Sequence, residues 1–72
     1  MRILTKSRIA GSFRGWSGQG LYELLNGQMW KQVNYKYCYR YAYRPSAKIW
    51  QDGSKYYLEV ENMNEMIQVR RV

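Results

Sequence analysis

Five tyrosines occupy successive odd positions in the middle of the chain: 35, 37, 39, 41 and 43. If this segment is an extended strand, all five phenol rings share one face, because side chains alternate along a strand. The residues between them include Lys36, Arg40 and Arg44. Rings can stack on bases while cations contact phosphates, so the pattern predicts a platform for single-stranded nucleic acid.

The same residue types have two other uses. The rings could supply strand propensity and core volume and nothing more, or they could anchor a protein partner, because Tyr, Trp and Arg are enriched at interface hot spots. One face of five rings cannot be wholly buried in so small a protein. We therefore expect ring bodies against the core with hydroxyls at the rim, or a twist that sends some rings inward and others outward. Pro45 is expected to end the run and to hold Arg44 extended.

The residue types that most often carry catalysis are scarce. The chain has no histidine, which removes the commonest general base and a leading metal ligand. Cys38 is the only cysteine and has no histidine partner, so it is expected to be inert. Glu59 and Glu61 share a strand face and could hold a hard cation weakly, although salt pairing with Lys55 or Arg70 is the expected use. We therefore predict no enzymatic activity and no cofactor or metal.

The positive charge of the chain is unevenly distributed. The net charge is +7, and residues 1–50 carry nine basic side chains against the single acid Glu23. Such a field attracts nucleic acid, anionic lipid or an acidic protein surface, although it could also serve solubility alone. No apolar run is long enough to cross a bilayer and no signal peptide is visible, so we expect no membrane partner. A lone cysteine fits a reducing compartment, and a cytoplasmic location is expected.

Short alternating segments predict the strands that must position these residues. Residues 8–14 place Ile9, Gly11 and Phe13 on one face of a half-buried strand. The glycines between 15 and 20 then predict a loop or sharp bend that carries Trp16; the stretch lacks the ending of a phosphate-binding loop and has no helix after it.

Two Gly-containing dipeptides predict hairpins with two-residue turns. Asn26-Gly27 would place Leu24 opposite Met29, with both inside, and Glu23 opposite Trp30, although Trp30 could take the inner face instead.

Asp52-Gly53 would place Ile49 opposite Tyr56 and Ala47 opposite Leu58 on the core side. On the solvent side, Trp50 would face Lys55 and Lys48 would face Tyr57, close enough for a cation–π contact. The inner face is expected to continue through Val60, Ile67 and Val69. Residues 61–65 should form a polar turn, and residues 68–72 an edge strand through which copies of the chain could associate.

This pattern is typical of an all-β protein. We expect residues 1–72 to form a single domain, a five- to six-stranded antiparallel meander that closes into an SH3-like barrel, with an OB-like barrel as the alternative. Gly15-Trp16, the segment 25–30 with its Asn-Gly-Gln-x-Trp pattern, and the Tyr-x-Tyr-Arg-Pro run ending at Pro45 resemble a small uncharacterised bacterial SH3-like β domain. That resemblance implies the fold and no role.

The sequence thus predicts a non-catalytic binding module that associates with nucleic acid. The alternative is a protein–protein interaction module, such as an inhibitor or accessory subunit, with exposed Trp, Tyr and Arg anchors. The candidate binding residues are Trp16, Trp30, Lys36, Tyr37, Tyr39, Arg40, Tyr41, Arg44, Lys48, Trp50, Lys55 and Tyr57.

Overall fold

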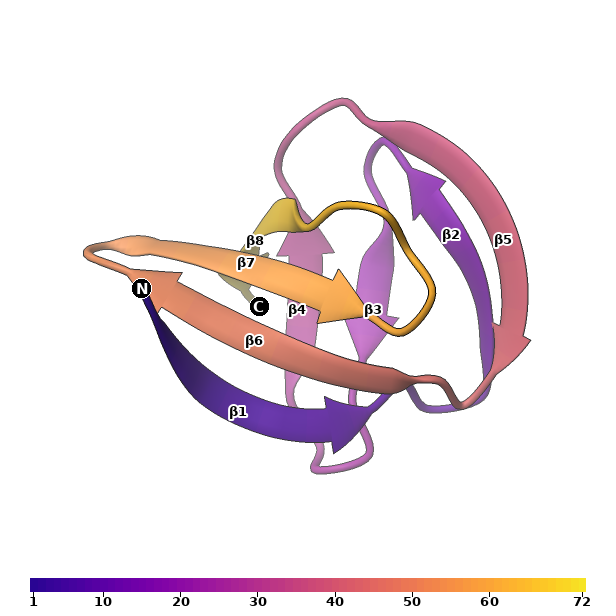
Figure 1. Ribbon diagram of the computed structural model, residues 1–72, viewed down its shortest axis with the longest axis horizontal. Coiled ribbons are helices and arrows are strands. Elements are labelled where there is room, and N and C mark those ends of the chain that lie inside the picture. The colour runs from indigo at the N-terminus through magenta and orange to yellow at the C-terminus, as the bar shows by residue number, and fades with distance from the viewer.

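A computed structural model describes all residues from 1 to 72 as strands, turns and loops, without a helix (Figure 1). The strands are β1 (Arg2–Arg8), β2 (Ser12–Ser17), β3 (Leu21–Glu23), β4 (Met29–Gln32), β5 (Tyr37–Tyr43), β6 (Ser46–Asp52), β7 (Lys55–Val60) and β8 (Ile67–Arg71). They form a six-stranded sheet in the order β1-β6-β7-β8-β4-β3 and a two-stranded ribbon of β2 and β5. All pairs are antiparallel. The predicted all-β antiparallel class is confirmed, with more strands than expected.

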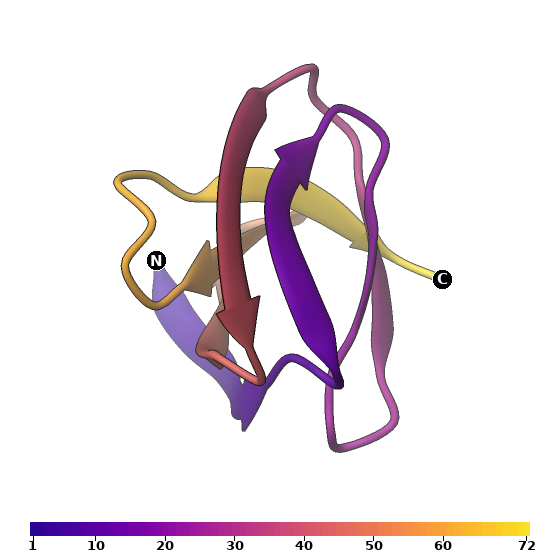
Figure 2. The same cartoon turned by 90° about the vertical axis from the view of Figure 1, so that its right-hand side faces the viewer.

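The ribbon lies to one side of the six-stranded sheet (Figures 1 and 2), and β5 is its outer strand in Figure 1. The core fills the space between the two sheets. Its buried hydrophobic residues are Ile9, Phe13, Trp16, Tyr22, Leu24, Trp30, Ala47, Ile49, Leu58, Val60, Ile67 and Val69. The inner face predicted for the last three strands is confirmed, and Tyr56 is half-buried against it.

The single strand predicted for residues 8–14 is wrong, because the chain bends in the middle of it, although Ile9 and Phe13 are buried as expected. β1 ends at Arg8, Gly11 has a φ of 77°, and β2 begins at Ser12. The bend carries the chain from the large sheet to the ribbon. At the bend, Ala10 N donates to Glu23 O (2.8 Å) and Leu25 N donates to Arg8 O (2.8 Å). These bonds join the ends of β1 and β3, the two edges of the large sheet, at one isolated bridge, and the pairing does not continue into a closed barrel.

The first hairpin has a longer loop than predicted. Leu24 N donates to Gln28 O (2.9 Å), Gly27 N donates to Leu24 O (3.0 Å), and Gly27 has a φ of 92°. This is a three-residue loop with glycine in the left-handed position. The register therefore shifts by one residue, so that Tyr22 pairs with Trp30 and Glu23 with Met29. A one-residue slip exchanges the faces of a strand, so Trp30 is buried whereas Met29 is only half-buried.

The second hairpin turns at Gly53 and Ser54, not at Asp52 and Gly53. Asp52 pairs with Lys55, Trp50 with Tyr57, and Lys48 with Glu59. The predicted partners are therefore wrong. The predicted faces are right, because moving the turn by one residue changes each partner by two positions, and side chains alternate with a period of two.

The C-terminal strand is not an edge. β8 lies between β7 and β4, so the edge strand predicted for residues 68–72 is wrong. The polar turn predicted for residues 61–65 is confirmed as part of the loop between β7 and β8. The strands with an unpaired edge are instead β1 and β3 in the large sheet and both strands of the ribbon.

Candidate nucleic-acid interface

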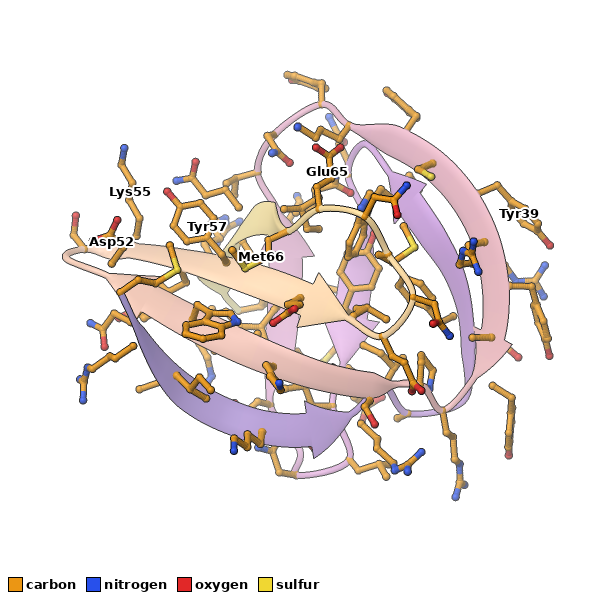
Figure 3. All side chains as sticks on the ribbon, in the orientation of Figure 1. Tyr39, Asp52, Lys55, Tyr57, Glu65 and Met66 are labelled. Atoms are coloured by element: carbon orange, nitrogen blue, oxygen red, sulfur yellow. The ribbon has the colours of Figure 1, made fainter.

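The tyrosine ladder, meaning Tyr35, Tyr37, Tyr39, Tyr41 and Tyr43, is exposed along its whole length. The exposed fractions are 75%, 73%, 74%, 55% and 64% in that order. Figure 3 shows the Tyr39 side chain directed away from the body of the molecule. The expected arrangement, with ring bodies against the core or some rings turned inward, is therefore wrong. Of the side chains of β5, only Ala42 packs against the core.

The rings are uncovered because the strand beside them carries small residues. Tyr37 pairs with Ser17, Tyr39 with Gly15, and Tyr43 with Ser12. Directly opposed residues of an antiparallel pair lie on the same face. No large side chain of β2 can therefore fold over these rings at the paired positions, and their faces stay accessible to a ligand.

Basic side chains lie beside the ladder. Arg14 of β2 is exposed, and the Arg44 guanidinium lies 5.4 Å from the centre of the Tyr43 ring. Arg40 of β5 is exposed too, but it alternates with the tyrosines and shares the face of Cys38 and Ala42, opposite the rings. Lys36 Nζ is 2.8 Å from Glu65 Oε2, which offsets its charge in this structure. Arg14, Tyr35 and Tyr43 were not among the predicted site residues; the odd-numbered spacing already pointed to the two tyrosines.

The backbone at Arg44 differs from the prediction. Its φ is 48°, in the left-handed region, so the residue before Pro45 is not extended. Arg8 Nη1 donates to Arg44 O (2.9 Å), and Arg44 N donates to Gly11 O (2.9 Å). These two bonds hold the turn that places the Arg44 side chain beside the end of the ladder.

Two predicted anchors are core residues. Trp16 lies within β2, not in a loop, and is 3% exposed; Trp30 is 1% exposed. The Trp16 ring packs edge-on against Phe13 and Tyr22, with centroids 5.5 and 5.8 Å away. Neither tryptophan can contact a partner directly, and both are removed from the candidate site.

The remaining predicted residues form a separate cluster on β6 and β7. Lys48, Trp50, Lys55 and Tyr57 lie on the outer side of this hairpin, and Figure 3 shows Lys55 and Tyr57 at the opposite end of the molecule from Tyr39. Acids lie beside these lysines, because Glu59 is opposite Lys48 and Asp52 is opposite Lys55 in the strand register. The exposed residues of the predicted site are therefore divided between two surfaces, and only the ladder has a clear excess of cations.

The two glutamates on β7 and after it have other partners than expected. Trp50 Nε1 donates to Glu59 Oε1 (2.8 Å), and Ser46 N donates to Glu61 Oε1 (3.1 Å). Neither forms the predicted salt pair with Lys55 or Arg70, since the only salt bridge in the structure joins Lys36 and Glu65. No group of three or more potential metal-ligating side chains occurs in the structure.

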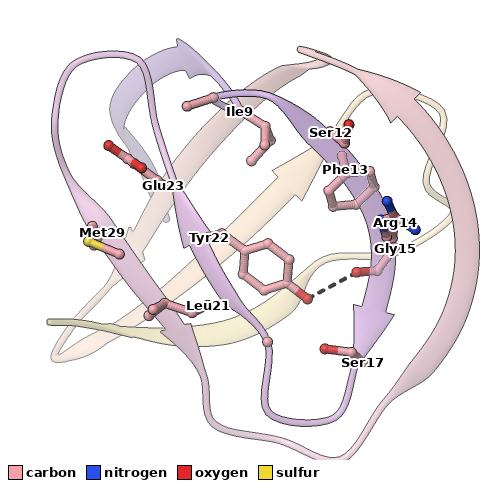
Figure 4. A pocket seen from close by; sticks show the side chains of 12 residues that line it. Ile9, Ser12, Phe13, Arg14, Gly15, Ser17, Leu21, Tyr22, Glu23 and Met29 are labelled. Atoms are coloured by element: carbon pink, nitrogen blue, oxygen red, sulfur yellow. Dashed lines mark hydrogen bonds between the residues drawn. The ribbon is translucent and has the colours of Figure 1, made fainter.

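A cleft of about 440 Å³ lies between β2 and β3, on the side of β2 away from β5 (Figure 4). Tyr22 bridges it: its hydroxyl donates to Gly15 O (3.0 Å) and lies 3.2 Å from Gln32 Oε1. Burial raises the pKa of the Tyr22 hydroxyl, and hydrogen bonding to Ser17 partly opposes this effect. A neutral, hydrogen-bonded phenol thus lines the cleft and links β3 to β2.

The structure has no helix long and apolar enough to cross a membrane. Comparisons with protein-family models, with curated proteins and with solved structures gave no match, so the tyrosine ladder and its surrounding arginines stand as the candidate site on their own geometry.

Proposed function

We propose that this protein is a non-catalytic module that binds single-stranded nucleic acid on its tyrosine ladder. The observation that carries the proposal is the exposure of all five rings, from 55% to 75%, on a small basic protein. Large aromatic side chains are costly to leave in water, whereas a base stacked on an exposed ring contributes about 1–3 kcal/mol. The rings stack on bases, and Arg14 and Arg44 contact phosphates.

The spacing of the ladder favours a single strand over a duplex. Alternate residues of a strand are about 6.6–6.8 Å apart, roughly twice the rise of about 3.4 Å per nucleotide in one strand of a duplex. A single strand can extend until its bases meet successive rings. Duplex bases are already stacked on one another and present only their edges.

The exposure of the ladder weighs against a role as core filler. The protein-interaction alternative loses two of its proposed anchors, because Trp16 and Trp30 are buried. As for the finer architecture, we propose an incomplete SH3-like barrel, supported by the bridge at which Ile9 and Leu24 bring the two edges of the large sheet together.

The salt dependence of binding to a fluorescent oligonucleotide tests the proposal. Each phosphate contact of a single strand contributes a slope of about −0.7 to log K against log salt, so two arginines predict about −1.4. Affinity for a pyrimidine oligonucleotide should then fall roughly sevenfold between about 50 and 200 mM salt. Arg14→Gln should make the slope shallower by about 0.7, because it removes one phosphate contact.

The matched control is Lys55→Gln, which removes one positive charge from the other cluster and should leave the slope unchanged. An affinity that does not respond to salt, or equal effects of the two substitutions, would rule out the proposed interface.

A further inference from the structure

The outer side of β5 is an unpaired strand edge. β5 pairs only with β2, and it is the outer strand of the ribbon in Figure 1. It is seven residues long, with no proline inside it. Long open edges are usually blunted in natural proteins, because their free N–H and C=O groups can pair with another chain. No strand pairs with this edge of β5.

The hydrogen-bond pattern shows which residues face this edge. Gly18 N donates to Lys36 O (3.1 Å) at one end of β5, and Arg44 N donates to Gly11 O (2.9 Å) at the other. Lys36 and Arg44 are an even number of positions apart, so the alternation is kept through the strand. Even-numbered residues turn their backbone groups toward β2. The backbone groups of Tyr37, Tyr39, Tyr41 and Tyr43 therefore face the open edge.

We infer that a second copy of this chain pairs antiparallel with β5 at this edge and makes a continuous four-stranded sheet with a double tyrosine row. At the new edge only residues with outward backbone groups can form hydrogen-bonded pairs, and on both copies these are tyrosines. Every permitted register thus pairs tyrosine with tyrosine. A two-fold axis perpendicular to the sheet places both rows on the same face, where cross-strand aromatic pairs are favourable.

Charge selects among the registers. Arg40 would oppose its own counterpart only if the two-fold axis passed through it. An axis at Tyr39 sets Arg40 opposite Cys38, and an axis at Tyr41 sets it opposite Ala42. Both avoid a like-charge pair, which makes either compatible with the basic character of β5.

The area available indicates a weak dimer. A standard stable interface buries about 800 Å² on each partner, whereas the whole chain exposes only 4611 Å². One strand edge with its rings supplies a small part of that. Two copies of a +7 protein also repel each other, and salt screens that repulsion. Association should therefore need high protein concentration and should strengthen with added salt, the reverse of the salt effect expected for nucleic-acid binding.

Sedimentation velocity over micromolar to millimolar protein, at low and high salt, tests this inference without any nucleic acid. We expect a monomer–dimer equilibrium that shifts toward dimer with concentration and with salt. Tyr41→Pro removes an edge-facing N–H that β2 does not use, so it should give a monomer. Tyr41→Ala, which keeps the N–H and loses the ring, should still dimerise, but more weakly.

Three results would overturn the inference: wild-type protein that stays monomeric at millimolar concentration in high salt, Tyr41→Pro protein that dimerises like the wild type, or Tyr41→Ala protein that dimerises no more than Tyr41→Pro. Circular dichroism checks that the proline variant is folded. If the proline variant is unfolded, the concentration and salt series on the unmodified chain still tests the inference. Because no oligonucleotide is present, this outcome is independent of the proposed function.

Discussion

Gly15 allows the ribbon to form in the geometry that exposes the ladder. It lies opposite Tyr39 with a φ of 91°, at the position where the register between β2 and β5 shifts. A Cβ built on it would overlap Cys38 O and lie 2.8 Å from Arg40 N, both backbone atoms of β5. Any side chain here would therefore push the two strands of the ribbon apart.

Gly15→Ala should lower the free energy of unfolding by about 3–5 kcal/mol, because it combines a left-handed backbone with a backbone clash. Gly27→Ala is the matched control, since Gly27 has a φ of 92° and nothing within 4 Å of an added Cβ. It should cost only about 1–2 kcal/mol. Urea denaturation compares the two. Equal losses of stability would mean that the close packing of β2 on β5 does not disfavour a side chain at position 15.

At the scale of elements, a polar network joins β2, β3 and β4 beneath the ribbon. The Tyr22 hydroxyl on β3 donates to Gly15 O on β2. Gln32 on β4 is 2% exposed, and its Nε2 donates to Lys36 O (3.0 Å), directly before β5. Both strands of the ribbon are therefore tied to the large sheet by buried side chains.

Tyr22 should make stability depend on pH in the alkaline range. Its pKa is higher in the folded protein because burial disfavours the phenolate. Its contribution to stability is thus complete below the unfolded pKa of about 10 and is lost as pH rises above that value. Tyr22→Phe should cost about 1–3 kcal/mol at neutral pH, because Gly15 O loses its donor. It should also weaken the alkaline decline.

Urea denaturation at pH 7 and pH 11 measures both effects, with Tyr35→Phe as the control for loss of an exposed hydroxyl. An alkaline decline of the same size in Tyr22→Phe as in the unmodified chain would contradict this role for Tyr22.

The two hairpins show how much of the fold the sequence can predict. The faces of β6 and β7 follow from the alternation of Ile49, Leu58 and their neighbours, and an error of one residue in the turn leaves them unchanged. The faces of β3 and β4 cannot be predicted in this way, because Asn26-Gly27 suits both two- and three-residue loops. Burial of Trp30 against Tyr56, with ring centroids 5.3 Å apart, accompanies the longer loop.

The candidate site was predictable in composition but not in position. The spacing of the tyrosines correctly indicated a strand for Tyr37, Tyr39, Tyr41 and Tyr43, whereas Tyr35 lies before the strand begins. Their exposure depends on Ser12, Gly15 and Ser17 of β2, a strand distant in sequence that local patterns did not define. Trp16 was misplaced for the same reason, since the glycines around it predict a loop and tertiary packing makes it part of the core.

At the scale of the whole molecule, charge and aromatic side chains separate into two surfaces. The ladder has arginines beside it and one acid, Glu65, paired with Lys36. The outer side of β6 and β7 carries lysines opposite Asp52 and Glu59. A ligand with phosphates and bases should therefore be bound by the ladder alone, although both surfaces contain cations and rings.

The most direct test compares two double variants in a fluorescence-anisotropy titration with one single-stranded oligonucleotide at low salt. Tyr39→Ala with Tyr41→Ala should weaken binding roughly thirtyfold or more, because two stacked bases contribute about 1–3 kcal/mol each. Lys55→Ala with Tyr57→Ala, on the other surface, should change affinity by less than about twofold. An unchanged affinity in the ladder variant, or a larger loss in the β7 variant, would contradict the assignment of nucleic-acid binding to the tyrosine ladder.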